Sequence, residues 1–253
     1  MTLAHDVHGD GTPLLLVHGM GLDRRMWEPN MAALTGRHRV VRCDLRGFGA
    51  TPPPDAPVSH ADDLRALLEQ LGIERAAVCG LSMGGGVALE LALAHPEVVS
   101  ALALVDTDLP GSPLDDELRA AVGAAGACAR SGDVDGARAA WLATPFFARS
   151  PPPVTAALER MVGDHAFWYM ANPGMQVWLE PRAAGRGGEV RAPALVLWGE
   201  HDVAHFVANC ERIARDIPDA RTAVLDGAGH MSNMDEPDAF DAALLAFLDE
   251  AGS

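Results

Sequence analysis

The sequence predicts an α/β fold, with a mostly parallel β-sheet covered by helices on both faces and one helical insertion. Three observations lead to this prediction. Short apolar runs alternate with helix-compatible segments over most of the 253 residues, as in sheets whose parallel strands are joined by helices. One strand-to-helix turn carries Gly80-Leu81-Ser82-Met83-Gly84. The alternation is interrupted once, over residues 109–190.

The predicted strands are short and mostly apolar, and residues 14–17 form a continuous apolar run, which is typical of a strand buried on both faces of a parallel sheet. They comprise residues 14–17, 39–43, 76–79, 98–105, 194–198 and 221–225, preceded by a weaker candidate at 3–8. Helices are expected between them at residues 22–34, 59–71, 87–94, 206–217 and 237–248. The second helix has Ser59 as its expected N-cap and Gly72 as its C-terminal stop, whereas the first contains Pro29.

Residues 109–190 contain no convincing strand, and helices are expected at 114–130, 134–142 and 154–170. We interpret this segment as a helical cap inserted into a core formed by residues 1–108 and 191–253. Seven of the thirteen aromatic residues lie in the cap: Trp141, Phe146, Phe147, Phe167, Trp168, Tyr169 and Trp178. Some of them pack the cap itself, but an insertion over a cleft also lines it. The expected pocket residues are Trp141, Phe146, Trp168 and Trp178.

Composition excludes several classes of function. The net charge of −16 argues against binding to nucleic acid or to an anionic membrane surface. All 19 basic residues are arginine, and the lack of lysine excludes Schiff-base chemistry and a phosphate-loop lysine. The cysteines are expected to be free thiols; they are Cys43, Cys79, Cys128 and Cys210. Since no signal-peptide pattern or membrane-length apolar run is visible, we expect a cytoplasmic protein.

The Gly80-x-Ser82-x-Gly84 motif predicts a nucleophile elbow. Its glycines let a strand and a helix pass closely, while the serine adopts a strained backbone and exposes Oγ at the carboxyl edge of the sheet. A serine hydroxyl needs an adjacent base near neutral pH. His230 follows the last predicted strand and Asp202 follows the preceding one. A base and a carboxylate that orients it would therefore emerge at the same edge as Ser82.

The chain order Ser82, Asp202, His230 fits the α/β-hydrolase fold superfamily, which the sequence resembles over nearly all its length. The resemblance is carried by His18-Gly19, Asp44-Leu45-Arg46-Gly47-Phe48-Gly49, Gly80-Leu81-Ser82-Met83-Gly84, Gly199-Glu200-His201-Asp202 and Gly227-Ala228-Gly229-His230. The sequence is most similar to small bacterial serine hydrolases that include 3-oxoadipate enol-lactonases and pimeloyl-ACP methyl ester carboxylesterase. The resemblance implies a catalytic triad of Ser82, Asp202 and His230. It also implies an oxyanion hole formed by the backbone N–H groups of Met20 and Met83.

Two features depart from the family pattern. The family usually has two strands before the strand that ends in His-Gly, whereas this sequence has room for one good candidate. The insertion carries no substrate motif that matches the family, so the family's substrates do not carry over to this chain.

Other residues support weaker hypotheses. Asp106 also follows a predicted strand and is an alternative orienting acid. His201 and His205 could be taken with Asp202 for metal ligands, but no further ligand lies at useful spacing, so we expect no metal and no organic cofactor. His18 is expected to brace the oxyanion loop, and Arg46 to be ion-paired in a structural turn.

The sequence thus predicts a serine hydrolase that cleaves a small, largely apolar carboxylic ester or lactone through an acyl-enzyme. The apolar preference follows from the aromatic cap, near which Arg149 and Arg160 are the nearest cations. Two alternatives stay open: carbon–carbon bond hydrolysis of a vinylogous diketone, and a non-catalytic ligand receptor on the same fold. A small-molecule substrate is the expected partner, and the sequence does not predict the oligomeric state.

Overall fold

Seven strands form one sheet in the computed structural model, which describes residues 2–252. The strands are β1 (His5–His8), β2 (Thr12–Val17), β3 (His38–Cys43), β4 (Ala76–Leu81), β5 (Val99–Val105), β6 (Ala194–Gly199) and β7 (Arg221–Leu225). Their order in the sheet is β1-β3-β2-β4-β5-β6-β7, with β1 antiparallel to β3 and every other pair parallel. This confirms the predicted fold class, including the single strand ahead of β2.

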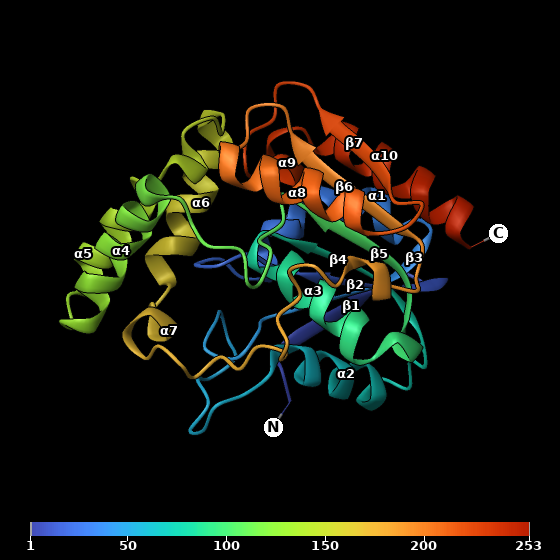
Figure 1. Cartoon of the computed structure of the whole chain (residues 1–253), viewed down its shortest axis with the longest axis horizontal. Coiled ribbons are helices and arrows are strands. Elements are labelled where there is room, and N and C mark those ends of the chain that lie inside the picture. The colour runs from blue at the N-terminus through green and yellow to red at the C-terminus, as the bar shows by residue number, and fades with distance from the viewer. Residues whose placement is uncertain (1, 253) are drawn as a thin grey trace.

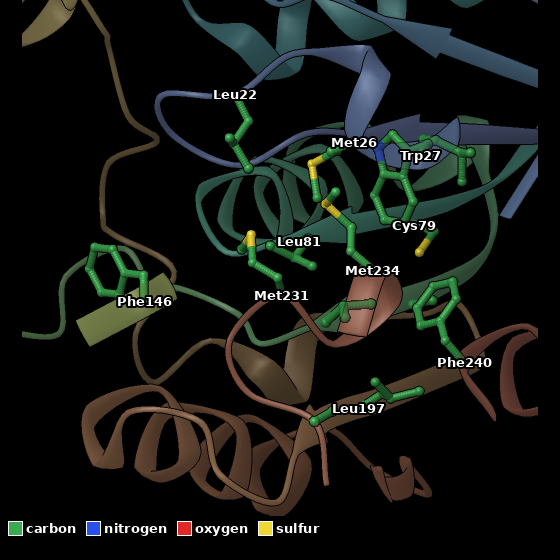
Figure 2. Packing of buried hydrophobic residues seen from close by; sticks show 14 of the residues in the cluster. Leu22, Met26, Trp27, Cys79, Leu81, Phe146, Leu197, Met231, Met234 and Phe240 are labelled. Atoms are coloured by element: carbon green, nitrogen blue, oxygen red, sulfur yellow. The ribbon is translucent and has the colours of Figure 1, made fainter. Parts of the chain in front are cut away.

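Helices cover both faces of the sheet (Figure 1). One face packs against α2 (His60–Gln70), α3 (Met83–Ala94) and α8 (Ala204–Asp216). The other packs against the 3₁₀ helix η1 (Arg24–Asn30), α1 (Met31–Thr35) and α10 (Pro237–Ala251). On this second face Trp27 and Phe240 lie beside each other with ring centroids 6.0 Å apart, and Met26 and Met234 lie close by (Figure 2). Alternate residues of each strand therefore pack into two separate hydrophobic cores, one on each face of the sheet.

The segment predicted as one helix over residues 22–34 is η1 followed by the short α1. Pro29 lies inside η1 and lacks the N–H group that a continuous α-helix needs at that position. The predicted helix at 59–71 is confirmed as α2. Ser59 Oγ accepts a hydrogen bond from Asp62 N–H at 3.2 Å, and Gly72 has a φ of +65°.

The segment between β5 and β6 is helical, and Figure 1 shows its helices α4 to α7 gathered beside the sheet. Its elements are α4 (Asp116–Arg130), α5 (Val134–Leu142), η3 (Pro145–Phe147), α6 (Pro152–Asp164), α7 (Trp168–Ala171) and η4 (Gly187–Glu189). The prediction of one helix over 154–170 is wrong. Helix α6 ends at Asp164, since His165 has an extended backbone with ψ 136°, and Phe167, whose φ of 50° is left-handed, precedes α7.

The remaining helical elements are η2 (Pro96–Val98) and α9 (Ser232–Asp235). Within residues 2–252 no helix combines the length and apolar character needed to span a bilayer. The four cysteines are free thiols, as the sequence predicts.

A buried carboxyl group joins α3 to the segment that returns from the insertion. Glu90 is buried on α3, and its Oε1 accepts a hydrogen bond from Leu179 N–H at 3.0 Å. Burial raises the pKa of Glu90 to about 7, against the opposing effect of the Leu179 N–H group. The Glu90 carboxyl group therefore binds its proton more tightly in the folded protein than in the unfolded chain. Its ionisation lowers the free energy of unfolding as pH rises from about 4.5 to about 7.

Glu90→Gln removes this penalty and keeps an oxygen that can accept the Leu179 N–H bond. The free energy of unfolding should therefore change little at about pH 5 and increase at about pH 8. Urea denaturation at both pH values measures the effect, with the exposed Glu159→Gln as a matched control. A Glu90→Gln effect that is equal at the two pH values would contradict the argument.

Candidate active site

Ser82 lies at the tight connection between β4 and α3, with φ 55° and ψ −120°. Its N–H group donates to the Val105 carbonyl at 2.9 Å, which fixes the turn against the neighbouring strand. A Cβ atom at Gly80 would come within 2.2 Å of the Gly84 carbonyl oxygen, and one at Gly84 within 2.4 Å of the Val17 carbonyl oxygen. Only glycine fits at either position, so the steric role predicted for the elbow glycines is confirmed.

His230 and Asp202 meet Ser82 at the carboxyl edge of the sheet. His230 follows β7, and its Nε2 lies 3.0 Å from Ser82 Oγ. Its Nδ1 lies 2.8 Å from Asp202 Oδ1, and Asp202 follows β6. These contacts form a continuous hydrogen-bonded line from a hydroxyl through an imidazole to a carboxylate, which is the arrangement that activates a serine.

Burial strengthens the interactions within this line. Asp202 and His230 are buried, whereas Ser82 is half-buried. Asp202 Oδ1 also accepts the Val203 N–H group at 2.6 Å. The loop before His230 is held by Asp235, whose Oδ2 accepts the Gly229 N–H group at 3.0 Å. Charges in a site of low polarity interact more strongly than in water, so the pair His230–Asp202 is held firmly.

Asp106, the alternative orienting acid, is buried beside this line without contacting the Nδ1 atom of His230 in its place. Its Oδ1 accepts Gly199 N–H at 2.9 Å, and its Oδ2 accepts the Ser232 hydroxyl at 2.5 Å. Burial, followed by the charge of Asp202, raises the pKa of Asp106 well above its usual value. The contact geometry therefore favours Asp202 as the residue that orients His230.

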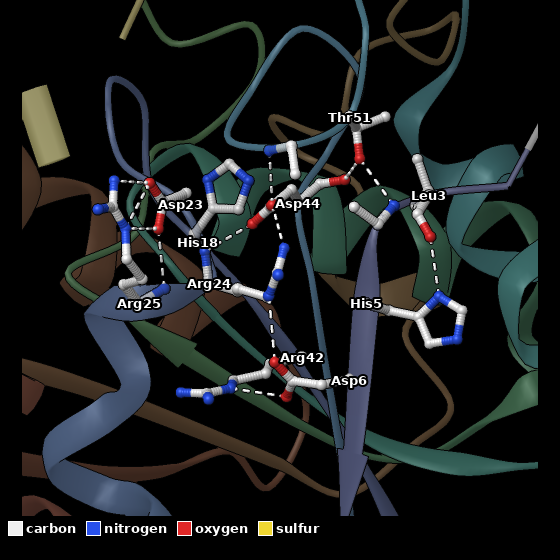
Figure 3. A network of polar contacts seen from close by, with 12 residues as sticks. Leu3, His5, Asp6, His18, Asp23, Arg24, Arg25, Arg42, Asp44 and Thr51 are labelled. Atoms are coloured by element: carbon white, nitrogen blue, oxygen red, sulfur yellow. Dashed lines mark hydrogen bonds and ion pairs between the residues drawn. The ribbon is translucent and has the colours of Figure 1, made fainter. Parts of the chain in front are cut away.

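The loop after β2 carries Met20 and is braced by buried polar contacts. His18 Nδ1 donates to the Gly19 carbonyl at 2.9 Å, and its Nε2 accepts Leu45 N–H at 3.0 Å. Burial lowers the pKa of His18, consistent with the neutral ring that this pattern requires. Asp44 accepts the Arg24 N–H group at 2.9 Å and also pairs with the Arg24 guanidinium (Figure 3). These contacts support the predicted bracing role of His18.

The turn after Asp44 is structural, as predicted. Arg46 pairs with Asp63 of α2 through two hydrogen bonds of 2.6 and 2.7 Å. The Ala50 N–H group donates to Asp44 Oδ2 at 2.9 Å. The two charged residues of this motif thus pair with groups outside it, Asp44 with Arg24 and Arg46 with Asp63, and fix the chain beside the site.

Two aromatic rings contact the imidazole of His230. The ring centroid of Phe146 lies 5.0 Å from that of His230, and the ring centroid of Phe206 lies 4.2 Å away. Phe146 was predicted as a pocket residue, whereas Phe206 was missed. Its position four residues after Asp202, at the start of α8, is the signal that could have identified it.

Trp141 lies against the loop that carries Met20. A Cβ atom at Gly21 would come within 2.6 Å of Trp141 Nε1, and Gly21 has a φ of +73°. The indole N–H group is buried and has no hydrogen-bond partner within residues 2–252. A buried donor without a partner is unfavourable.

The structure places the other two predicted pocket residues, Trp168 and Trp178, away from Trp141 and Phe146. Trp168 packs against Tyr169, with ring centroids 4.9 Å apart, and near Gly47. Trp178 lines a surface groove with Ser59 and Glu90. Both pack against the core on the α2 and α3 side of the sheet, whereas Trp141 and Phe146 belong to the opposite core. Trp168 follows the break between α6 and α7, which the sequence pattern does not predict.

One group of atoms in the described part of the chain is close enough to bind a metal ion. Ligand atoms of Asp106, Asp202 and His230 lie within 4.8 Å of one another. Both His230 nitrogens, however, contact Asp202 and Ser82, and Asp106 accepts two hydrogen bonds. These atoms fit a hydrogen-bonded catalytic cluster better than a metal site. His201 is exposed, with its Nε2 3.6 Å from Glu200.

Comparisons with known proteins identify the family to which the chain belongs. A profile of the alpha/beta hydrolase family matches residues 14–243. The chain is 32% identical to "Putative carbamate hydrolase RutD" of Azorhizobium caulinodans, over 98% of this chain and 95% of the relative. Among solved structures it is similar to the enol-lactonase from Burkholderia xenovorans, at 29% identity and a TM-score of 0.82, covering 98% of this chain and 96% of that chain.

A thermophilic esterase from Thermogutta terrifontis is also similar, at 29% identity and a TM-score of 0.81 over 99% of this chain and 94% of that chain. The fold and these similarities over nearly the full length of the chain point to the same family. The resemblance to bacterial esterases and lactonases is therefore confirmed. The chain belongs to the alpha/beta hydrolase family and is a hydrolase enzyme.

Proposed function

We propose that the protein is a serine hydrolase that cleaves a small, largely apolar carboxylic ester or lactone through an acyl-enzyme formed on Ser82. One observation carries this proposal: the hydrogen-bonded line from Ser82 Oγ to His230 Nε2 at 3.0 Å, and from His230 Nδ1 to Asp202 Oδ1 at 2.8 Å. The solved esterase and enol-lactonase to which the chain is similar act, by their names, on the corresponding bond types.

In the proposed reaction, Ser82 Oγ attacks the substrate carbonyl carbon while its proton passes to His230 Nε2. Asp202 stabilises the imidazolium that forms and keeps its Nδ1–H directed away from the serine. The leaving alkoxide takes the proton from His230, which leaves an acyl group on Ser82. A water molecule then attacks the acyl carbon and gives its proton to His230; the bond from the acyl carbon to Ser82 Oγ breaks, His230 returns the proton to Oγ, and the carboxylic acid is released.

The negative charge that develops on the substrate carbonyl oxygen needs hydrogen-bond donors that point at this oxygen. Met83 is the first residue of α3, where a backbone N–H group has no acceptor within the helix. We assign the second donor to the N–H group of Met20, in the loop that His18 braces. Such donors each contribute about 3 kcal/mol to transition-state stabilisation, and the N-terminus of α3 adds a favourable dipole.

The substrate portion next to the carbonyl would contact aromatic surface. Phe146 and Phe206 flank His230, and Trp141 lies at Gly21 beside Met20. In this proposal residues 109–190 act as a cap on the core of residues 1–108 and 191–253, and supply two of these three rings. This aromatic lining favours an uncharged acyl group.

A carbamate is a second candidate substrate class, since a relative 32% identical to this chain carries that name. The same attack of Ser82 on a carbamate carbonyl would release an amine or ammonia instead of an alcohol. Comparing kcat/KM for a neutral ester, a lactone, a carbamate and a dienone tests these classes. The dienone tests carbon–carbon bond hydrolysis in the same experiment.

A cytoplasmic location stays a prediction.

Ser82→Ala should lower kcat by about 10³- to 10⁶-fold, because no other residue can form the acyl-enzyme. The variant should also lose labelling by a fluorophosphonate probe, whereas replacing an exposed serine, Ser131→Ala, should leave labelling unchanged. Ester hydrolysis and mass spectrometry of the labelled peptide measure both effects. Turnover above about a tenth of the wild-type rate in Ser82→Ala would exclude the serine mechanism.

Asp202→Asn should lower kcat by about 10⁴-fold, because an amide at this position favours the wrong tautomer of His230. Glu200→Gln is the matched control, since it makes the same change of charge two residues away on an exposed side chain. Steady-state kinetics with one neutral ester compares the two variants. Equal losses would show that charge near the site, and not orientation of the imidazole, explains the effect.

Lengthening the acyl chain of a neutral ester from about two to about six carbons should raise kcat/KM by about tenfold or more, because each buried methylene contributes about 0.8 kcal/mol. Phe146→Ala should weaken this dependence. Phe147→Ala, which removes the adjacent ring, should preserve it, since the rings that contact His230 are those of Phe146 and Phe206, whereas Phe147 packs on Trp141 and Phe146. If chain length had no effect, or if anionic esters were preferred, the aromatic lining would not determine specificity.

A further inference from the structure

The proposed mechanism leaves one buried carboxyl group at the site without a role. Asp106 follows β5 and is completely buried. Its φ of 43° is left-handed, which is uncommon for a residue with a side chain. Its N–H group donates to the Leu197 carbonyl at 2.9 Å. A strained backbone and complete burial together indicate that the position of this carboxyl group matters.

The Asp106 side chain connects the two segments that carry Asp202 and His230. Its Oδ1 accepts the N–H group of Gly199, three residues before Asp202, at 2.9 Å. Its Oδ2 contacts the hydroxyl of Ser232, two residues after His230, at 2.5 Å. The Asp106 side chain thus contacts both the end of β6 and the connection that follows β7.

Within residues 2–252, the Asp202 carboxylate has an oxygen without a hydrogen-bond donor. Its Oδ1 contacts His230 and Val203, but its Oδ2 is buried and lacks a partner in the described part of the chain. Ligand oxygens of Asp106 and Asp202 lie within 4.8 Å of each other. A buried carboxylate oxygen without a donor is costly. Two ionised carboxylates this close also repel each other strongly, and a proton on Asp106 would remove both costs.

We propose that Asp106 is a neutral carboxylic acid that acts as a positioning residue, donating a hydrogen bond to Asp202 Oδ2 and tying the Asp202 and His230 loops together. The proposal rests on the proposed function, since it assumes that Asp202 orients His230. Asp106 itself does not contact the reacting atoms. Its role is to fix the carboxylate that holds the base.

The electrostatic surroundings support a neutral Asp106. Burial and the Asp202 charge raise its pKa well above the usual value, and they outweigh the Ser232 and Gly199 donors, which lower it. The titratable groups that face it are Asp202, His230 and the thiol of Cys210 on α8. Burial raises the pKa of Cys210 well above its ordinary value, so this thiol stays neutral and adds no charge beside Asp106.

Two substitutions separate a neutral donor from an ionised carboxylate. Asp106→Asn is uncharged, keeps an oxygen for Gly199 and offers an amide donor to Asp202, so it should retain most of the wild-type kcat. Asp106→Ala removes the donor and should lower kcat by about 10- to 100-fold, as is typical when the support of a catalytic group is lost. Thr107→Ala, which shortens the adjacent buried side chain, is the matched control.

The pH dependence of kcat/KM provides a readout that packing alone would not change. If Asp106 is neutral, Asp106→Asn should leave the midpoint of the acidic limb unchanged. In Asp106→Ala the midpoint should move to higher pH, because Asp202 without its donor attracts the His230 proton more strongly. A shift to lower pH in Asp106→Asn would show that a negative charge had been removed, and would overturn the proposal. Equal losses of kcat in the two variants would also overturn it.

Infrared spectroscopy tests the protonation state without activity. The difference between wild type and Asp106→Asn at neutral pH should contain the carbonyl stretch of a protonated carboxylic acid, shifted in heavy water. Absence of this band contradicts the proposal. If Asp106→Ala does not fold, Asp106→Asn and the infrared band decide the question. If Ser82 is not labelled by a fluorophosphonate, the proposed function fails, while the infrared band still reports on Asp106.

Discussion

The close passage of β4 and α3 is the constraint on which the site depends. The strand turns into the helix through the single residue Ser82, whose left-handed backbone is held by its N–H bond to the Val105 carbonyl. The Gly84 backbone lies so near Val17 and Gly80 that no side chain fits. The strained turn points the hydroxyl out of the sheet edge and leaves the first N–H groups of α3 free. One local geometry thus supplies both the nucleophile and part of its electrostatic environment.

The order of the strands in the sheet explains how the other groups reach Ser82. Strands β4, β5, β6 and β7 are neighbours and run parallel, so their carboxyl ends lie side by side at one edge. Ser82, Asp106, Asp202 and His230 each follow one of these four strands. A group that is distant in sequence, such as His230, is therefore brought into hydrogen-bonding distance by the sheet and not by the loops alone.

The sequence predicted the fold class correctly because buried strands and the turns between them are local patterns, and the same patterns led to the proposed triad. A buried parallel strand is a continuous apolar run, and a polar residue directly after it must lie at the sheet edge. The insertion has no predicted strand whose end would fix where the following residues lie. Its helices were recognised from their spacing, but the break between α6 and α7 and the separation of Trp168 from Trp141 follow from tertiary packing. Phe206 was missed because it belongs to the core and not to the aromatic insertion.

Two carboxyl groups at this edge could in principle orient His230, and their hydrogen bonds distinguish them. Asp202 Oδ1 contacts His230 Nδ1 at 2.8 Å and accepts the Val203 N–H group at 2.6 Å. Asp106 spans two neighbouring connections, and burial next to Asp202 disfavours a second charge. Because two adjacent buried carboxylates cannot both ionise cheaply, the charge of one determines the protonation of the other. The environment, and not the residue type, thus gives two identical side chains different roles.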